Sequence, residues 1–363
     1  MIYKGLKGVT CTETTLSMID GERGKLIYAG YDARDLSMNH SFEEVAYLLW
    51  YGTLPNESEL QWIEEKFKTH RNLPHYMKNI IENLPKELGI LDVLRTSISS
   101  VHLNSPEIPT VEDAIRLTAI IPAIIAYRLH SLGTKKFPTI RQDLNHVAYY
   151  YYMATGIDPK PELTHALETY MILTMEHGLN ASTFSARVTA SSESDLASSM
   201  TSAIGTMKGP LHGGAPTGVI ELLNDASHSN NIKSMIREKM ERGEKLMGFG
   251  HRVYKTLDPR AEALKEILQQ NPKADQWFSL ALELEDIAIQ TLEELKPGRN
   301  LYTNVEYYAA AVMKALNIDS SLFTATFTAS RIVGWSAHVM EQRSNNTIFR
   351  PNAEYIGPVP TTF

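Results

Sequence analysis

Three segments near the middle of the chain place a histidine beside glycine or asparagine, in a pattern that packing alone does not require. They are residues 176–182 (EHGLNAS), 208–215 (KGPLHGGA) and 248–255 (GFGHRVYK). Histidine changes its charge near neutral pH, and glycine beside it allows a ligand to approach the backbone closely. One such histidine alone is more often a surface or core residue, but three in one part of the chain predict a functional site.

Metal binding and nucleophilic catalysis are the first alternatives for such a site. The histidines lack the HExxH spacing of zinc enzymes, the chain has no CxxC motif, and carboxylates beside the histidines are few. The one cysteine, Cys11, lies in a segment predicted to be extended, and no G-x-S-x-G elbow, phosphate loop or dinucleotide fingerprint occurs. Hydrogen bonding and acid–base chemistry by the histidines remain. Arg260, Arg331 and Arg350 would then bind a carboxylate-bearing substrate through bidentate hydrogen bonds.

The elements that must position these residues are almost all helical. The first thirty residues predict two short strands around a glycine-bearing turn at residues 20–24. Further on, Ser41 and Glu44 have the spacing of a capping box ahead of a helix that Gly52 closes. Apolar residues over 163–174 predict an amphipathic helix that ends near His177. No fixed-period repeat and no alternation of strands with helices occurs, which disfavours a solenoid or a parallel α/β sheet.

The most apolar run, residues 117–127 (LTAIIPAIIAY), is predicted to be a buried helix. A membrane span would need about 20 residues. Proline removes one helical hydrogen bond and crowds the preceding turn, so Pro122 should kink this helix.

Composition limits the class of protein. The chain has 363 residues, of which 43% are hydrophobic and 21% charged, which is enough for two or three domains with a large core. A single cysteine favours a reducing compartment, and the start, MIYKGLKG, lacks the apolar core of a signal peptide, so we expect a cytoplasmic protein. The net charge of −7 argues against nucleic acid or an anionic membrane as the main partner. A positive excess over residues 233–260 indicates either a small anionic ligand or a solvated helix face.

Together, the motifs KGPLHGGA, GFGHRVYKTLDPRAEAL, EHGLNAST and FRPNAEYIG resemble the citrate synthase family. The opening segment GLKGVTCTETTLSMIDGERGKLIYAGYDARDL is also similar to the start of that family, so the resemblance covers essentially the whole chain. It implies a mainly α, citrate synthase-like two-domain helical fold with a short N-terminal hairpin. Residues 1–212 and 318–363 would form the large domain, and residues 213–317 a small domain that closes over the cleft.

The resemblance implies a homodimer that condenses acetyl-CoA with oxaloacetate and water to give citrate and CoA, without metal or cofactor. By motif, His212 matches the histidine that hydrogen-bonds the thioester oxygen, and His251 the one that polarises and protonates the oxaloacetate carbonyl. The positions that match oxaloacetate ligands are His177, Asn180, Arg260, Arg331 and Arg350, with Arg350 donated to the neighbouring subunit's site. The positions that match CoA contacts are Leu246, Met247, Gly248, Phe249, Gly250 and Lys255.

One position departs from the family pattern. The segment that usually reads NVD, whose aspartate takes the methyl proton, here reads Asn304-Val305-Glu306. The intrinsic acidities of aspartate and glutamate are similar, so Glu306 is the predicted third catalytic residue. Glutamate is one methylene longer, however, and a misplacement of about 1 Å can cost on the order of a hundredfold in rate. We therefore expect either a slower synthase or one whose backbone has retreated to fit the longer side chain.

Three other functions stay open on the sequence. A 2-methylcitrate synthase would accept propionyl-CoA, and one methylene is worth only about 1–3 kcal/mol of discrimination. A weakened paralogue with a binding or regulatory role is suggested by Glu306 alone. A metal-dependent hydrolase that uses the three histidines would contain bound zinc.

Overall fold

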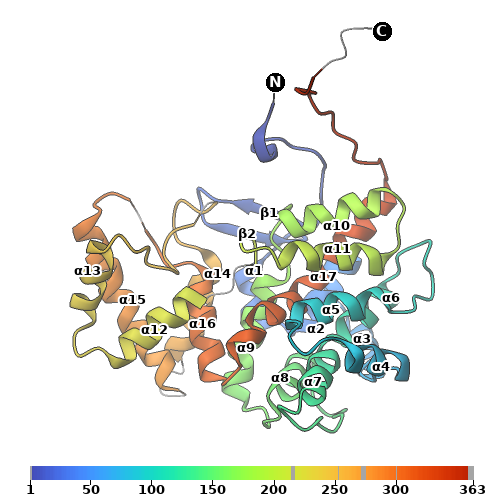
Figure 1. The fold of residues 1–363 in the computed structure, drawn as a ribbon, viewed down its shortest axis with the longest axis horizontal. Helices are drawn as coiled ribbons and strands as arrows, with labels where there is room; N and C mark the ends of the chain where they lie inside the picture. The colour runs from blue at the N-terminus through green and yellow to red at the C-terminus, as the bar shows by residue number, and fades with distance from the viewer. Residues whose placement is uncertain (1, 214–216, 252, 271–274, 300, 359–363) are drawn as a thin grey trace.

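The computed structural model describes residues 2–213, 217–251, 253–270, 275–299 and 301–358. Figure 1 shows a chain that is helical nearly throughout, with a small sheet near its N-terminus. The predicted mainly α fold with an N-terminal hairpin is therefore confirmed.

The N-terminal sheet supports a loop of the site. Strands β1 (Ser17–Asp20) and β2 (Lys25–Tyr28) pair antiparallel, and β3 (Tyr31–Asp32) pairs with β2. A Cβ on Gly21, in the turn between β1 and β2, would come 2.3 Å from the carbonyl oxygen of Val253. Glycine is therefore needed there, because it lets the hairpin turn pack directly against the backbone that follows His251.

The helices between residues 4 and 207 come first in sequence. They are η1 (Lys4–Leu6), α1 (Ala33–Asn39), α2 (Phe42–Tyr51), α3 (Glu57–Thr69), α4 (His75–Asn83), α5 (Ile90–Ser99), α6 (Val111–Ala119), α7 (Ile121–Ser131), α8 (His146–Thr155), α9 (Pro161–Met175), α10 (Ala181–Ser191) and α11 (Leu196–Met207). The later ones are α12 (Thr217–His228), α13 (Ile232–Glu241), α14 (Pro259–Gln270), α15 (Gln276–Leu295), α16 (Val305–Ala315), η2 (Ser320–Leu322) and α17 (Phe323–Ser344).

Helix ends lie where the capping residues predict them. Ser41 and Glu44 form the reciprocal capping box at the start of α2, and Gly52 ends that helix in the left-handed conformation. The apolar run around Pro122 differs from the prediction: it is divided into α6 and α7 instead of forming one kinked helix, and Pro122 occupies the first turn of α7. Proline suits a first turn, where its missing N–H is not needed. Among the described residues, no helix is both long and apolar enough to cross a membrane.

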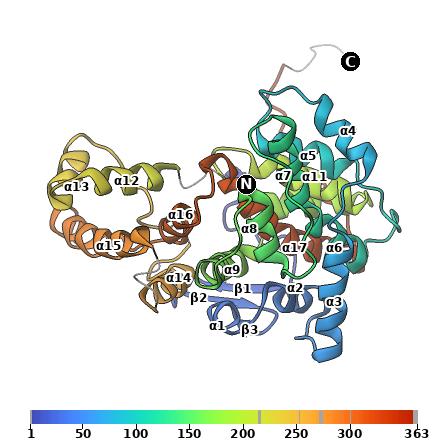
Figure 2. The ribbon, with the colours of Figure 1, turned by 90° about the horizontal axis from the view of Figure 1, so that it is seen from below.

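The helices fall into two groups in Figure 2. Helices α12 to α16 pack on one another and form the lobe on the left, while the other helices gather around α17. Helices α14 and α16 also contact α9, which joins the lobe to the body. The lobe falls within the segment 213–317 that the sequence assigns to a small domain, and the domain boundaries themselves stay a prediction.

The long helix α17 packs closely against the end of α9. A Cβ on Gly334, in the middle of α17, would lie 2.3 Å from the carbonyl oxygen of Met175, the last residue of α9. Real Cβ atoms do not approach an oxygen so closely, so the glycine sets the separation of the two helices. This contact fixes α17 relative to the turn that carries His177.

We predict that Gly334→Ala separates α17 from α9 and lowers stability by about 1–3 kcal/mol, the usual cost of overpacking a core. Gly205→Ala, within α11, is the matched control, because its new Cβ would meet only the flexible Arg95 side chain, with Cδ at 3.8 Å and Nη1 at 4.0 Å. That control should keep or raise the melting temperature, since alanine favours a helix over glycine by up to about 1 kcal/mol. Thermal unfolding of both variants is the measurement, and equal melting temperatures would contradict the packing argument.

Candidate active site

Two of the predicted histidines meet around one tyrosine. His177 follows the end of α9, and its Nε2 lies 3.1 Å from the hydroxyl oxygen of Tyr254. The ring centroids of His177 and His251 are 6.1 Å apart, and those of His251 and Tyr254 are 4.8 Å apart. Arg260 from α14 lies beside this cluster, with its guanidinium carbon 5.6 Å from the Tyr254 ring centroid. Residues from two separate motifs thus form one cluster.

The backbone sets the tautomer of His251. The N–H groups of Val253 and Tyr254 each donate to His251 Nδ1 at 3.1 Å, so this nitrogen is an acceptor and the proton of the neutral ring lies on Nε2. Arg260 Nη2 lies 3.3 Å from that Nε2, but a guanidinium only donates, so with the ring proton on Nε2 this is a contact between two donors and not a hydrogen bond. Burial, together with the nearby Arg260 charge, lowers the pKa of His251 to about 4. His251 is therefore a neutral ring with an Nε2–H donor.

His212 has the opposite arrangement. Its Nε2 accepts from the backbone N–H of Ser182 at 3.3 Å and lies 2.7 Å from the Ser182 hydroxyl. Trp335 of α17 donates to the same hydroxyl at 3.0 Å and so holds it in place. Burial lowers the pKa of His212 to about 4, and the charge of Arg331 adds to the effect. His212 is therefore neutral with its proton on Nδ1.

Arg331 is the group around which the other residues gather. Its side chain, on α17, is only 2% exposed, donates from Nε to the Thr174 carbonyl oxygen at 2.5 Å and lies over the ring of Phe327. Its charge acts on the pKa values of His177, His212 and Glu306. Two of the three histidine motifs and the Glu306 segment therefore converge on one buried cation.

Arg260 and Glu306 are positioned by a shared carboxylate. Asp258 accepts from Arg260 Nε at 3.0 Å and from Arg260 Nη2 at 2.9 Å, and its Oδ2 also accepts from the backbone N–H of Val305 at 3.1 Å. Val305 is the first residue of α16, so Asp258 joins the start of this helix to α14. Asn304 caps α16 by accepting from the N–H of Glu306. The helix start, and with it Glu306, is thereby fixed relative to Arg260.

Glu306 is half-buried and points a carboxyl group into this charged environment. Burial raises the pKa of Glu306, and the nearby Asp258 raises it further, while Arg260 and Arg331 oppose both effects. A carboxylate with a raised pKa is a stronger base than an ordinary glutamate, which suits proton abstraction.

The predicted CoA loop is a glycine turn anchored on the start of α16. Gly248 and Gly250 both have positive φ, 91° and 87°, and Phe249 forms an isolated bridge with Thr303. The backbone of Asn304 donates to the Gly248 carbonyl at 2.9 Å. In this turn Leu246 is buried, whereas Met247 is 50% exposed and available to a ligand. Lys255 is exposed on the same loop, where its backbone N–H donates to the Gly21 carbonyl. Arg252, Gly214 and Ala215, which belong to the quoted motifs, lie outside the described residues.

Two predicted ligands are placed differently from the rest. Asn180 caps α10, because its side-chain oxygen accepts from the Thr183 N–H at 3.1 Å, and the same oxygen lies 2.9 Å from the Ser182 hydroxyl oxygen. Its role as an oxaloacetate ligand stays a prediction. Arg350 is exposed on the extended segment that follows α17, and this segment leaves the helical body in Figure 1. One chain alone therefore brings together His177, His212, His251, Arg260, Glu306 and Arg331, but not Arg350.

Several residues that hold the site have no role assigned from the sequence. Tyr254 and Ser182 lie inside quoted motifs, and Trp335 lies four residues after Arg331, but motif reading does not single them out because their contacts join segments far apart in the chain. Asp258 precedes Pro259 in the pattern of a helix cap, and it does accept from the Arg260 backbone N–H at 3.1 Å. Its pairing with the Arg260 guanidinium was not foreseen, although the spacing D-P-R was the available signal.

Taken together, the fold and the site define the class of protein: an α-helical enzyme whose site gathers neutral histidines, two buried arginines and one glutamate, a set suited to a carboxylate-bearing substrate. In the described part of the chain, no group of three or more His, Cys, Asp or Glu side chains is placed to hold a metal ion. Residues 5–352 match the family described as "Citrate synthase, C-terminal domain". The chain belongs to the citrate synthase family.

Similar proteins include "Citrate synthase 2" of Bacillus subtilis, which is 38% identical over 98% of this chain and 96% of its own length. The "2-methylcitrate synthase" of Shewanella oneidensis is also 38% identical, over 98% of this chain and 95% of its own. Among solved structures, citrate synthase from Thermotoga maritima has a TM-score of 0.86 and 39% identity, covering 100% of this chain and 98% of its own. The citrate synthase of the archaeon Thermoplasma acidophilum, solved as a ternary complex with carboxymethyl coenzyme A and oxaloacetate, has a TM-score of 0.84 and 29% identity, covering 100% of this chain and 98% of its own.

We predict that nitrogen NMR of the imidazole rings at about pH 7 finds His212 protonated on Nδ1 and His251 on Nε2, both neutral. The signals are assigned by their loss in His212→Gln and His251→Gln. On acidification each ring should gain its second proton only near the pKa of about 4 that burial and the arginines impose. A ring that titrates near the ordinary value of 6.5, or identical tautomers, would refute this assignment.

Proposed function

We propose that the chain condenses acetyl-CoA with oxaloacetate and water to give citrate and CoA. The observation that carries this proposal is the pair of neutral histidines of opposite tautomer that share a site with two buried arginines and Glu306. Such a site offers one base and two uncharged hydrogen-bond donors, which is the set that an enolisation followed by attack on a ketone requires.

The first step is removal of a proton from the acetyl methyl group. Glu306 takes this proton, and the electron pair moves toward the thioester oxygen. The Nδ1–H of His212 donates to that oxygen and stabilises the enol form. Because a thioester methyl group is a very weak acid, a fixed donor aimed at the oxygen supplies much of the required stabilisation.

The second step forms the new carbon–carbon bond. The enol carbon attacks the ketone carbon of oxaloacetate, and His251 gives its Nε2 proton to the oxygen that becomes a hydroxyl. Before the next turnover Glu306 releases the methyl proton to water and the His251 ring takes up a proton from water, so the proton count is restored. Arg260 and Arg331, with Arg350 from a partner subunit, neutralise and orient the two carboxylates of oxaloacetate. Water then cleaves the thioester bond of citryl-CoA, which releases citrate and the CoA thiol.

The glycine turn from Leu246 to Gly250 and the exposed Lys255 form the side to which CoA binds in this proposal. Met247 offers an apolar surface, and Lys255 offers a cation for a CoA phosphate. The reaction needs no cofactor and no metal, because the thioester is itself a substrate and the donors are side chains. Helix α13 carries three other basic residues of this segment, and two of them, Lys233 and Arg237, pair with Glu294, as on a solvated helix face.

The assay that tests this function measures release of free thiol from acetyl-CoA or propionyl-CoA in the presence of oxaloacetate, with a chelator present throughout. Faster release from acetyl-CoA is expected. A preference for propionyl-CoA would indicate a 2-methylcitrate synthase, the activity named for the relative from Shewanella oneidensis. No release with either thioester would refute the proposal and favour a binding protein, and release that stops with chelation would favour a metal enzyme.

We predict that Glu306→Gln lowers turnover by about 10²–10⁴-fold, the usual worth of a positioned general base. Glutamine keeps the size of the side chain but cannot accept the methyl proton, so the KM for oxaloacetate should barely change. Glu306→Asp is the companion variant: its activity should fall if the start of α16 is placed for the longer side chain. A glutamine variant with near-normal turnover would show that another group takes the proton.

A second prediction concerns the partner subunit. Arg350 is exposed, whereas Arg260 and Arg331 are buried, and in this proposal it completes the site of a partner subunit in a homodimer. His251→Ala and Arg350→Ala homodimers should each be nearly inactive, and mixing them should restore partial activity, because each hybrid dimer contains one intact site. Mass spectrometry of the mixture confirms subunit exchange. Exchange without recovered activity would contradict a shared site.

A further inference from the structure

One face of α17 supports every part of the site in the body of the protein. Arg331, Trp335, His338 and Gln342 are spaced by four, three and four residues, so they lie along one side of the helix. Arg331 enters the site itself, and Trp335 holds the Ser182 hydroxyl that contacts His212. His338, one turn further on, contacts neither substrate position and has no role in the proposed reaction. Its own contacts lead to the turn that carries His177.

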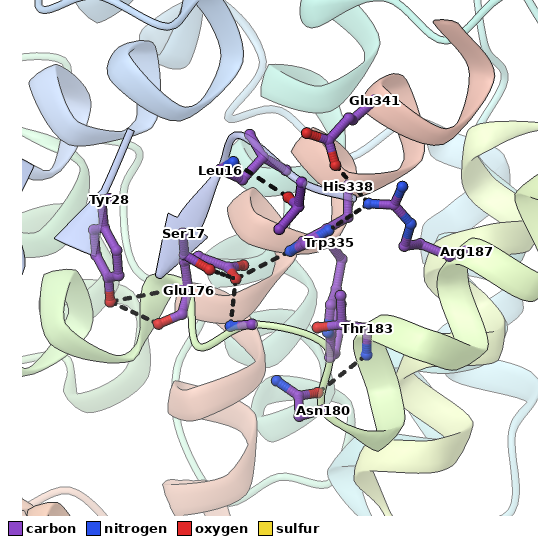
Figure 3. A network of polar contacts seen from close by, with 12 residues as sticks. Leu16, Ser17, Tyr28, Glu176, Asn180, Thr183, Arg187, Trp335, His338 and Glu341 are labelled. Atoms are coloured by element: carbon purple, nitrogen blue, oxygen red, sulfur yellow. Dashed lines mark hydrogen bonds and ion pairs between the residues drawn. The ribbon is translucent and has the colours of Figure 1, made fainter. Parts of the chain in front are cut away.

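Glu176, the residue between α9 and His177, is completely buried. Its Oε1 accepts three hydrogen bonds: from the Gly178 backbone N–H at 2.6 Å, from the Ser17 hydroxyl at 2.8 Å and from His338 Nε2 at 3.0 Å. The Tyr28 hydroxyl also donates to its backbone carbonyl at 2.7 Å. Figure 3 shows Ser17 and Tyr28 reaching this residue from the N-terminal strands. The turn is thus held on both sides of His177.

The turn needs such support because its backbone is unusual. Gly178 has a φ of 60°, in the left-handed region, and a Cβ there would meet the Ile19 side chain at 3.1 Å. The Gly178 N–H is directed back at Glu176 Oε1 across His177. This short bond closes a loop around His177 and therefore fixes the direction in which the imidazole leaves the backbone.

A buried arginine lies behind His338. Arg187 Nη1 lies 2.9 Å from His338 Nδ1, and because a guanidinium only donates, Nδ1 must accept. His338 then carries its proton on Nε2 and donates it to Glu176. Arg187 is itself held by Glu341 at 2.6 Å, Gln342 at 3.0 Å and Thr12 at 3.2 Å. Figure 3 shows the resulting order from Arg187 through His338 to Glu176.

This arrangement keeps Glu176 ionised inside the core. Burial alone would raise the pKa of Glu176, yet His338, Arg331 and the hydrogen bonds to its carboxylate together lower it. An ionised oxygen can accept three hydrogen bonds at once, which a neutral carboxylic acid or an amide of the same size does less well.

We propose that Arg187, His338 and Glu176 form a hydrogen-bonded relay in which Glu176 is a positioning residue for His177 and thereby for oxaloacetate. Glu176 does not touch the substrate. It sets the angle of the His177 turn, and the relay holds its carboxylate in the one orientation that bonds Gly178. The proposal rests on the function proposed above, since it assigns the consequence to oxaloacetate.

Substitutions at position 338 separate a relay from simple packing. A glutamine there can accept from Arg187 through its oxygen and donate to Glu176 through its nitrogen, whereas a leucine can do neither. His338→Gln should therefore keep the oxaloacetate KM within about threefold, while His338→Leu and Glu176→Gln raise it by about 10- to 100-fold, as expected for loss of hydrogen bonds to a charged group. The KM for acetyl-CoA should stay nearly constant in all three variants.

Glu43→Gln is the matched control. Glu43 is also buried and also accepts a backbone N–H, that of His146 at 2.7 Å, but it lies on α2 away from the His177 turn. This variant should lose stability without a change in the oxaloacetate KM. Equal KM values for wild type, His338→Leu and Glu176→Gln would overturn the proposal, as would an equal rise in Glu43→Gln.

Hydrogen–deuterium exchange gives a readout that does not depend on the reaction. Peptides that cover residues 176–182 should exchange faster in His338→Leu than in His338→Gln or wild type, because the Gly178 N–H loses its fixed acceptor. If the wild-type protein releases no thiol in the activity assay, the proposed function fails, and the exchange experiment still decides whether the relay holds the turn. Unchanged exchange in His338→Leu would refute the relay.

Should His338→Leu or Glu176→Gln not fold, Arg187→Lys takes its place. Partial loss of protection from exchange over residues 176–182 is then expected, and full protection would refute the proposal.

Discussion

The burial of two guanidinium groups beside each other is the constraint on which the rest of the site depends. Arg260 and Arg331 are each almost completely buried, and a buried charge is costly unless fixed groups compensate it. Asp258 pairs directly with Arg260 through two hydrogen bonds. Arg331 instead donates to the Thr174 carbonyl and lies over Phe327, and neither contact supplies a negative charge. The charge of Glu176 supports the cationic form of Arg331 from a distance.

The same two cations explain why histidines serve here as neutral groups. Burial removes the water that would stabilise an imidazolium, and each histidine of the site also feels a guanidinium charge, so the pKa values fall. Backbone N–H groups then select one tautomer at His251 and the other at His212. At neutral pH the site thus holds uncharged imidazole N–H groups that are ready to donate hydrogen bonds. Glu306 experiences the opposite effect from burial, which makes the one carboxylate among them more basic.

The sequence predicted the local parts of this structure well, because they depend on neighbours in the chain. The hairpin, the capping box of Ser41 and the end of α9 before His177 all follow from such short-range rules. At Pro122 the sequence predicted one kinked helix, whereas the structure has two helices, α6 and α7. Proline is compatible with a kink and with a helix start, and tertiary packing decides between them. The helix α16 was foreseen only as a segment that carries Glu306.

Contacts between distant segments could not be predicted in this way. The motifs named His177, His212 and His251, yet residues from a distant helix help to orient two of them: Trp335 supports His212, and His338, through Glu176, supports the His177 turn. Trp335 and His338 lie on α17 at helical spacing, where a buried polar residue in sequence looks like any other core position. A polar stripe inside an otherwise buried helix was the available signal. Its meaning depends on which turn each residue faces, and only the packed structure provides that.

The position of α17 therefore links stability to substrate binding. Gly334 sets the distance between α17 and α9. Arg331, before this glycine, enters the site, and His338, after it, supports the turn that carries His177. A shift of this helix would move both Arg331, which binds oxaloacetate in the proposed reaction, and the support of His177. Because both act on the same carboxylate-bearing ligand in the proposed reaction, the site tolerates little independent movement of its parts. A rigid helix is a better carrier for such groups than separate loops, since one packing contact then fixes several side chains at once.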